Sequence, residues 1–198
     1  MEIKLELVSG KDIALHAMRN PWDSWDMSSK EADKDLCEKL ILAGPEHAKH
    51  LRMIMCWFTV KAPRYWWQEM DTYKFVEKVS CSTMHTLTRR LLTEDDFECD
   101  GKIPYFQLNH LNNLILMYRD IKESKESKDN NRAEKLENTM RQLKQSLPES
   151  FLQQRTCMIS YAELRNIYRQ RKHHRLIEWH KFCHWIEELP DAWMITME

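Results

Sequence analysis

The sequence predicts a helix-rich α/β (α+β) fold, a single domain over residues 1–198 with a small mixed or antiparallel sheet. Three observations support this prediction. A chain of 198 residues is long enough to build one hydrophobic core. Segments with a helical spacing of apolar residues outnumber those with strand-like patterns. No internal repeat is visible, so a solenoid or propeller is not indicated.

Three segments carry the signals of β-strands. Ile3–Val8 alternates apolar and charged residues, which is typical of a half-buried strand. Met55–Val60 is rich in residues that favour strands. Phe151–Ser160 contains the third predicted strand. Lys74–Ser82 is polar with small residues, and we interpret it as a loop.

Helical spacing and end signals predict most of the remaining elements. Pro21, Gly44-Pro45 and Pro63 supply helix stops or starts. The predicted helices of the first half cover 12–18, 29–43, 46–53, 64–73 and 82–92. Those of the second half cover 106–124, 133–146 and 161–188, the last as one or two helices. Glu123–Arg132 is charged and of low complexity, which predicts a flexible hinge.

Composition narrows the class of protein. The formal net charge of −1 argues against bulk attraction to a nucleic acid polymer or an anionic membrane, so an anion site must be local. No stretch approaches the ~20 apolar residues of a membrane span, and the N-terminus lacks a signal-peptide pattern. We therefore expect a cytoplasmic protein.

Cysteine and glycine usage argues against two kinds of site. The six cysteines are scattered without a CxxC pair, as expected of small buried hydrophobes rather than zinc ligands. Only three glycines are present, so no glycine-rich phosphate loop exists. His180 and His184 have i, i+4 spacing but lack a suitable set of further ligands, and we expect no metal site.

The basic segment 164–175 is the strongest candidate for an anion site. On one continuous helix, Arg171 and Arg175 would lie one turn apart, and their guanidinium groups would converge on a single anion. The alternative is a charged helix face paired with Glu163 and Glu178.

Two further segments leave alternatives open. In 62–73, Gln68 suits the amide edge of a base and a tryptophan suits ring stacking. The alternative is a core of Trp66, Trp67 and Met70, with Arg64 and Asp71 as a surface pair. In 80–85, Cys81 beside His85 suggests a thiolate, whereas Ser82 suits a helix N-cap, the more favoured interpretation.

The order of several motifs resembles that of the flavin-dependent thymidylate synthases (ThyX-like proteins). Leu147-Pro148 precedes a strand near Met158, and a helix follows with Leu164-Arg165-Asn166 and Arg171. The matching pieces earlier in the chain are Ala17-Met18-Arg19 with Trp22 and Ser24, Gly44-Pro45-Glu46, Phe58-Thr59-Val60, and Pro63 ahead of a helix holding Gln68. The resemblance covers most of the chain.

This resemblance implies an α/β domain that assembles into a homotetramer, with active sites between subunits. FAD would carry hydride, deoxyuridine monophosphate (dUMP) would be the substrate, methylenetetrahydrofolate would supply the carbon, and NADPH is an expected reductant. Arg171 would be the catalytic residue, stabilising negative charge on the uracil carbonyls. The implied substrate-binding residues are Gln68, Lys144, Ser82 and Arg64. The implied cofactor-binding residues are Asn166, Arg175, Gln170, Thr72, Tyr73 and Lys78.

One departure from the family concerns charge. The family's Arg-His-Arg triplet falls at Asp71-Thr72-Tyr73, which exchanges two guanidinium groups for one carboxylate. Flavin binding in the usual pose then requires positive charge from Arg64, Lys74 and Lys78.

The sequence thus predicts a thymidylate-synthase-like enzyme of nucleotide biosynthesis that transfers a one-carbon unit to a pyrimidine deoxynucleotide with reduced flavin. Two alternatives remain. The first is a pseudoenzyme of the same fold that binds nucleotide or a protein partner without flavin chemistry, and the changed triplet favours it. The second is a helical interaction protein with no small-molecule site, whose arginines form a solvated face.

Overall fold

The computed structural model describes residues 1–124 and 131–198. They form two compact units. Unit 1 comprises 1–60, 71–79 and 155–198, and unit 2 comprises 61–70 and 80–154. The prediction of a single domain stays a prediction. Most of the predicted hinge, residues 125–130, lies outside the described residues.

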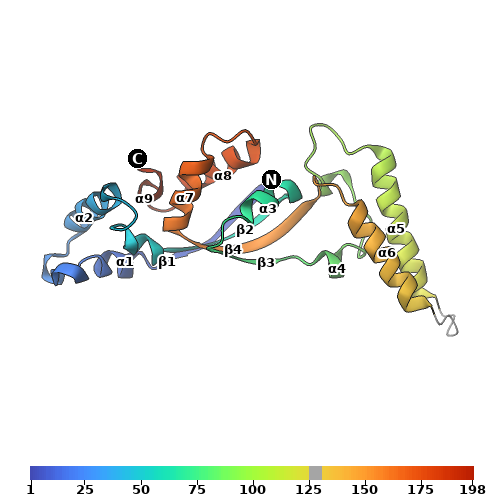
Figure 1. Ribbon diagram of the computed structural model, residues 1–198, viewed down its shortest axis with the longest axis horizontal. Helices are drawn as coiled ribbons and strands as arrows, with labels where there is room; N and C mark the ends of the chain where they lie inside the picture. Colours follow the sequence, from blue (N-terminus) through green and yellow to red (C-terminus); the bar gives the residue numbers. More distant parts are fainter. Residues whose placement is uncertain (125–130) are drawn as a thin grey trace. The chain divides into compact units, whose positions relative to one another are not determined.

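The chain is helix-rich and contains a small antiparallel sheet of four strands, as predicted (Figure 1). The strands are β1 (Glu2–Ser9), β2 (Met55–Pro63), β3 (Val76–Ser80) and β4 (Leu152–Ser160). Their spatial order is β1-β2-β4-β3. Three of the four strands were predicted from the sequence, and β3 was not.

The helices of unit 1 cover one part of this sheet. They are α1 (Lys11–Ala17), α2 (Lys30–Ala43), α7 (Tyr161–Arg171), α8 (Ile177–Glu187) and α9 (Trp193–Thr196), with the 3-10 turns η1 (Asn20–Trp22), η2 (Trp25–Met27) and η3 (Lys49–Arg52). Ser29 and Ser160 are the N-caps of α2 and α7. Each serine side chain accepts a hydrogen bond from the backbone amide three residues later.

Aromatic side chains fill the core of unit 1. Phe58 of β2 meets Phe182 of α8 with ring centroids 5.8 Å apart. Phe182 also packs edge to face against Trp179 at 5.8 Å. Such edge-to-face pairs add to the free energy of burial. This aromatic core fixes the position of α8, and through it the position of Trp179, which matters for the site below.

β1 forms as predicted, but neither of its faces is buried. Leu5 is 36% exposed and Leu7 is 53% exposed. The alternation of apolar and charged residues therefore predicted the strand correctly and its burial wrongly. The alternation indicates that one face of β1 is apolar and can pack against another apolar surface. It does not indicate whether that other surface belongs to the same chain.

Unit 2 is built around a helical hairpin. Its helices are α3 (Arg64–Met70), α4 (Thr83–Thr86), α5 (Tyr105–Glu123) and α6 (Arg132–Ser146), with the 3-10 turn η4 (Glu94–Asp96). α5 packs against α6, and Figure 1 shows the two side by side. The core of this unit consists of Leu87, Leu92, Phe97, Ile103, Leu111, Leu114, Ile115, Leu143, Leu147 and Phe151.

Three short segments differ from the sequence-based predictions. The predicted loop 74–82 contains strand β3, whose polar residues fit its position at the edge of the sheet. The predicted helix 46–53 forms only the turn η3. The predicted helix 82–92 is reduced to α4. Its threonines favour helix poorly, and the Leu92 backbone instead pairs with the Asn112 side chain in both directions.

The buried cysteines behave as small hydrophobes, as predicted. Cys37, Cys56, Cys157 and Cys183 are buried free thiols. Burial raises the pKa of Cys37 and of Cys56 to about 12, so both stay protonated at neutral pH. Within the described ranges 1–124 and 131–198, no group of three His, Cys, Asp or Glu side chains is arranged to hold a metal ion. No helix in those ranges is both long and apolar enough to cross a membrane.

His50 gives unit 1 a predicted sensitivity to acid. It is 4% exposed, its Nε2 lies 3.1 Å from Cys37 Sγ, and burial lowers its pKa from the ordinary 6.5. Because the unfolded chain takes up this proton more readily, stability should be full above pH 6.5. It should then be lost as the pH falls toward the lower pKa of the folded state. Urea midpoints at about pH 7.5 and about pH 5.5, on either side of the ordinary histidine pKa, measure the loss.

The exposed His47 provides the control for this prediction. His47→Gln should keep the loss of stability between the two pH values, whereas His50→Gln should reduce it. An equal pH dependence in all three proteins would contradict the assignment to His50.

Candidate functional site

Arg171 is the last residue of α7, and its guanidinium group lies against two aromatic rings of unit 1 that also pack edge to face on each other. Its guanidinium carbon lies 4.6 Å from the centre of the Trp179 ring and 5.5 Å from that of Tyr73. Its Nε donates a hydrogen bond of 2.8 Å to the Tyr73 hydroxyl. A guanidinium over an aromatic face is attracted by the negative face of the ring. Arg171 is therefore fixed in orientation and partly buried.

A chain of hydrogen bonds continues from Arg171 along α7. The Tyr73 hydroxyl donates to Gln170 Oε1 at 3.0 Å, and Gln170 Nε2 donates to Asn166 Oδ1 at 2.8 Å. Asn166 Nδ2 donates to Glu163 Oε1 at 3.4 Å. The i, i+4 spacing of Asn166 and Gln170 places them on one helix face. We call Glu163, Asn166, Gln170, Arg171, Tyr73 and Trp179 the arginine network.

The arginine network brings together four residues predicted from the sequence: Arg171, Gln170, Asn166 and Tyr73. It also contains Glu163 and Trp179, which the sequence did not single out for this role. Trp179 lies beyond the turn between α7 and α8, so helical spacing relative to Arg171 gave no signal for its contact. Tyr73 is 6% exposed, and its hydroxyl joins Arg171 to Gln170.

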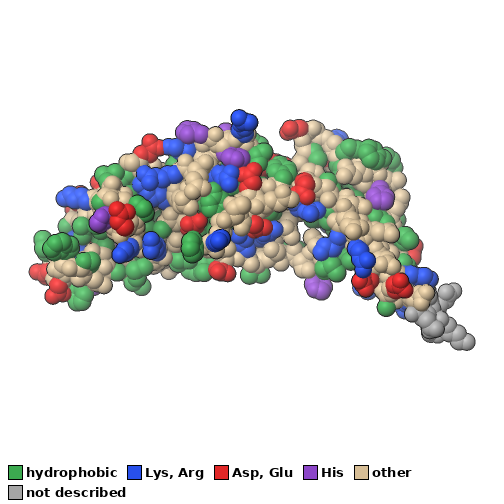
Figure 2. Space-filling model, in the orientation of Figure 1, with side chains coloured by type: hydrophobic (Ala, Val, Ile, Leu, Met, Phe, Trp, Pro, Cys, Tyr) green, Lys and Arg blue, Asp and Glu red, His purple; other side chains and the backbone are tan. Residues whose placement is uncertain are grey.

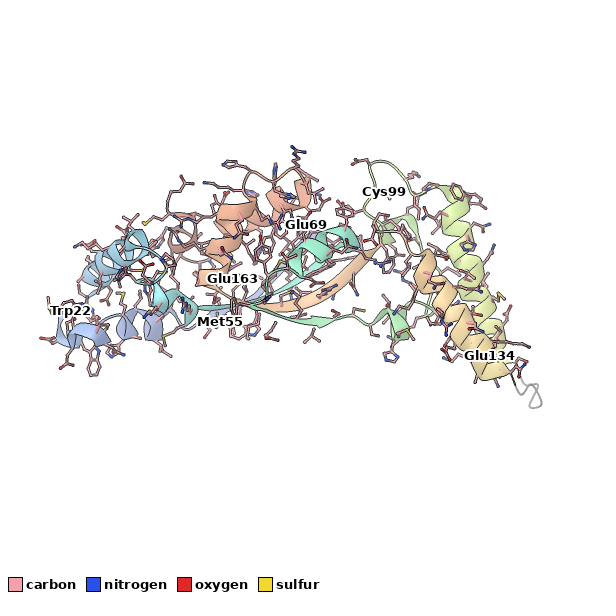
Figure 3. The ribbon with its side chains drawn as sticks, in the orientation of Figure 1. Trp22, Met55, Glu69, Cys99, Glu134 and Glu163 are labelled. Atoms are coloured by element: carbon pink, nitrogen blue, oxygen red, sulfur yellow. The ribbon has the colours of Figure 1, made fainter. Side chains whose placement is uncertain are left out.

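A pocket of about 480 Å³ adjoins the arginine network in unit 1. Glu163, labelled in Figure 3, and Asn166 belong to both. The apolar side chains of the pocket come mainly from the segment 45–51 and from Phe75, which is 79% exposed. Its lining is Pro45, Ala48, Leu51, Arg52, Phe75, Ser160, Ala162, Glu163 and Asn166. A mostly apolar pocket with a few polar groups at its edge suits a flat ring with polar substituents.

Asp71, the first residue of the altered triplet, lies in a separate group of charges in unit 1. Arg155 Nη1 donates to both of its carboxylate oxygens, at 2.8 and 3.0 Å. Lys78 Nζ lies 3.3 Å from Asp71 Oδ1. Two cations thus share one carboxylate. Lys78, a predicted cofactor residue, forms this ion pair, and Thr72 is exposed between Asp71 and Tyr73. Arg155 was missed because it lies 84 residues from its partner.

The residues predicted to bind substrate lie in unit 2. Arg64 Nη1 donates to the Leu147 carbonyl at 3.0 Å, and its Nη2 lies 3.6 Å from Glu149 Oε1. Gln68 Nε2 donates to Glu149 Oε2 at 2.8 Å. Arg64 and Gln68 are therefore brought together by Glu149, which the sequence did not indicate. The alternative pairing of Arg64 with Asp71 is wrong, whereas Trp66, Trp67 and Met70 are buried in the core as that alternative required.

Two other predicted substrate residues of unit 2 lie exposed. Lys144 is in the last turn of α6, three residues before Leu147, whose carbonyl Arg64 binds. Ser82 occupies the N-cap position of α4, but its side chain makes no capping hydrogen bond. Its carbonyl instead accepts from the Thr86 hydroxyl at 2.8 Å. The predicted cap is correct in position and wrong in its contact.

Arg175 does not lie on the helix of Arg171. α7 ends at Arg171, the chain turns through 172–176, and α8 begins at Ile177. His174 Nδ1 accepts a hydrogen bond from the Leu176 amide just before α8 begins. The predicted convergence of two arginines one turn apart is therefore wrong. Successive cations repel one another along a single helix, and the turn instead allows Arg171 to lie over Trp179.

Comparison with known proteins gives a clear result for the fold. No protein-family model and no curated protein sequence matches the chain. Solved structures do. One is the flavin-dependent thymidylate synthase ThyX from Helicobacter pylori complexed with FAD and dUMP, with a TM-score of 0.76 at 20% identity over 99% of this chain and 98% of that one. A second structure of that enzyme with the same two ligands gives 0.75 at 19% identity, with the same coverage.

The chain has the fold of the flavin-dependent thymidylate synthases. The resemblance inferred from the order of motifs is thus confirmed in three dimensions, over nearly the whole length of both chains. The ordered succession of weak motifs was the correct signal. Some of these motifs lie at the end of an element, as Gly44 does at the C-cap of α2, and others lie inside one, as Phe58-Thr59-Val60 does in β2. Arg19 of the Ala17-Met18-Arg19 motif links the segment after α1 to α2 through an ion pair with Asp33.

Proposed function

We propose that this protein is a flavin-dependent thymidylate-synthase-like enzyme that binds a dUMP-like pyrimidine deoxynucleotide and transfers a one-carbon unit to it. The observation that carries the proposal is the arginine network, found in a chain that has this fold over its whole length. The two ThyX structures hold FAD and dUMP, which makes both molecules the first candidates for this chain.

Arg171 is the residue to which we assign the catalytic role. A guanidinium group is planar, always charged and rich in donors, so it suits the carbonyl oxygens of a pyrimidine ring. Tyr73 and Trp179 hold it in one orientation before a ligand arrives. Fixed donors aimed at developing negative charge lower the barrier without reorganisation. Gln68 and Arg64 of unit 2, together with Lys144 and Ser82, are the proposed substrate-binding residues.

The pocket beside the arginine network has a composition that suits a flavin. Its apolar lining with Phe75 suits an aromatic ring, and the Asn166 amide, the Ser160 hydroxyl and Arg52 offer hydrogen bonds and one positive charge. When bound there, FAD would supply the hydride of the reaction. Asn166 and Gln170, with Tyr73, Thr72, Lys78 and Arg175, are the proposed cofactor-binding residues. The residues of the chain itself would bind and orient the ligands and exclude water from the site. Methylenetetrahydrofolate as carbon donor and NADPH as reductant complete the proposal.

We further propose a cytoplasmic homo-oligomer, with a tetramer as the expected state. Several large apolar side chains of unit 1 are exposed, which suits a surface between subunits. They include Leu7 of β1, Trp22 at 84% and Met27 at 65% exposure, and Figure 3 labels Trp22.

A second candidate function is a pseudoenzyme of the same fold, which binds nucleotide or a protein partner without flavin. The ion pairs of Asp71 favour it. Arg155 and Lys78 are two cations close to the altered triplet, and both already bind the Asp71 carboxylate. A flavin phosphate would have to compete with that carboxylate. The other alternative, a helical interaction protein, required the arginines to form a solvated face. Arg169 and Arg175 are exposed. Arg165, however, is only 8% exposed and Arg171 lies against two aromatic rings, which does not fit that alternative.

Calorimetric titration of dUMP into the protein, with and without FAD, tests the proposal. We expect the purified protein to take on the yellow absorption of FAD and to bind dUMP more tightly when FAD is present. Thymidylate should form only when methylenetetrahydrofolate and a reductant are added. A protein that stays colourless with FAD yet binds dUMP equally well in both titrations would identify the pseudoenzyme.

A further inference from the structure

Unit 2 contains a second pocket, of about 580 Å³, which none of the residues of the proposed enzyme function lines. It lies between the segment that follows α4 and the last turns of α5. Three of its side chains are basic and one is acidic. Its lining is His85, Thr88, Arg89, Tyr118, Arg119, Lys122 and Glu123. Figure 2 shows basic side chains interspersed with acidic ones over this end of the helical hairpin.

Two short stretches of the chain supply these side chains. His85 belongs to α4, and Thr88 and Arg89 lie in the turns that follow it, where the Arg89 amide donates to the Thr86 carbonyl at 3.0 Å. On α5, Lys122 lies about one helical turn beyond Tyr118 and Arg119. Leu87 points the other way, since it is 4% exposed in the core of unit 2 with Leu114 and Ile115. Its burial turns the neighbouring polar side chains toward α5.

A hydrogen bond fixes the two walls against each other. Arg119 Nε donates to the Thr88 carbonyl at 2.8 Å, so the guanidinium plane is anchored at the pocket wall. An anchored guanidinium loses little further freedom when it binds an anion. Within residues 1–124 and 131–198, no ion pair joins Arg89, Arg119 or Lys122 to a carboxylate.

Basic side chains near a helix C-terminus often bind the last carbonyl groups of the helix, and at the end of α5 Arg132 does so in place of Arg89 and Lys122. Arg132 Nε donates to the Ile121 carbonyl at 3.0 Å, and its Nη2 donates to the Lys122 carbonyl. Arg89 and Lys122 are therefore not required to satisfy that helix end, and their charge remains directed at the pocket.

We propose that this pocket binds a small ligand carrying a diphosphate group. Two arginines and a lysine match the several negative charges of such a group, and guanidinium forks match phosphate geometry. Glu123 and the Tyr118 hydroxyl offer hydrogen-bond partners for a hydroxyl or amino group elsewhere on the ligand. A nucleic acid polymer fits less well, because the net charge of the chain is −1 and the cations are confined to one pocket.

Titration with inorganic pyrophosphate in a phosphate-free buffer tests this site in the full-length protein. Pyrophosphate should bind clearly more tightly than sulfate at equal ionic strength. Arg89→Gln and Lys122→Gln, both at exposed positions, should each weaken pyrophosphate binding about tenfold, the usual effect of losing one charge-assisted hydrogen bond. Arg141→Gln, an exposed residue of α6 paired with Glu137, is the matched control and should leave the affinity unchanged.

Two further measurements complete the test. Tighter binding of ADP than of pyrophosphate would identify a nucleoside diphosphate as the ligand, and equal binding would assign recognition to the phosphates alone. Both results support the site. Arg89→Gln should also keep the dUMP affinity of the unmodified protein, which separates this pocket from the arginine network. Pyrophosphate binding no tighter than sulfate, or unchanged by both pocket variants, would overturn the proposal.

Discussion

Replacing Arg171 with alanine should weaken dUMP binding by about 10- to 100-fold, as measured by calorimetric titration with FAD present. The estimate corresponds to losing a hydrogen bond from a charged group, worth roughly 1.5–3 kcal/mol. Arg171→Lys should recover little of the loss, because an ammonium group cannot reproduce a planar fork that is stacked on Trp179 and bonded to Tyr73.

Arg169→Ala is the matched control for this prediction. Arg169 lies two residues earlier on α7 and is exposed, so its removal should leave the dUMP affinity unchanged. The two variants should also differ in stability. Arg171→Ala loses contacts with two aromatic rings and a hydrogen bond, and we expect a cost of about 1–2 kcal/mol. Arg169→Ala should stay within about 0.5 kcal/mol. Equal behaviour of the two variants would show that Arg171 belongs to a solvated face.

The elements that the sequence predicted well are those whose signals are local. α2, α5 and α6 have apolar spacing over several turns and clear end signals, and their observed bounds differ from the predicted ones by one residue at most. β2 carries strand-forming residues of which every second side chain is buried, and in β4 Cys157 and Ile159 are buried. In each case the information lies within about a dozen consecutive residues.

The features that the sequence missed involve contacts between different elements. β3 has polar residues and becomes a strand because β4, more than 70 residues later, offers its hydrogen-bonding edge. The helix break after Arg171 accompanies a contact between Arg171 and Trp179, which belongs to the next helix. Packing between elements overrides local propensity in both cases.

The same distinction applies to the candidate site. Arg171, Gln170 and Asn166 were predicted together because one helix carries them, and the structure joins them as expected. The ion pair of Asp71 with Arg155 spans 84 residues, and so no spacing rule could have found it. This ion pair changes the charge expected beside the altered triplet. The Asp71 carboxylate is paired with Arg155 of β4 and with Lys78, and the formal charge of these three side chains together is positive.

Replacing Asp33 with alanine should lower the free energy of unfolding by about 3–5 kcal/mol, the usual cost of removing one member of a buried ion pair. Asp33 accepts hydrogen bonds from Arg19 Nε at 2.6 Å and from the Ser28 hydroxyl at 2.7 Å. The side chains of Arg19 and Asp33 are only 5% and 12% exposed. Without Asp33, the Arg19 guanidinium would stay buried without its carboxylate partner.

Urea denaturation of two further variants distinguishes the ion pair from the helix that carries it. Asp35→Ala, an exposed position two residues further along α2, should change the free energy of unfolding by less than about 0.5 kcal/mol. The double variant Arg19→Met with Asp33→Leu should recover most of the loss, because an apolar pair of similar volume avoids the cost of burying an uncompensated charge. If Asp33→Ala and Asp35→Ala proved equally mild, the Arg19–Asp33 contact would not hold the segment after α1 against α2, and the arrangement of unit 1 would have to rest on its aromatic core alone.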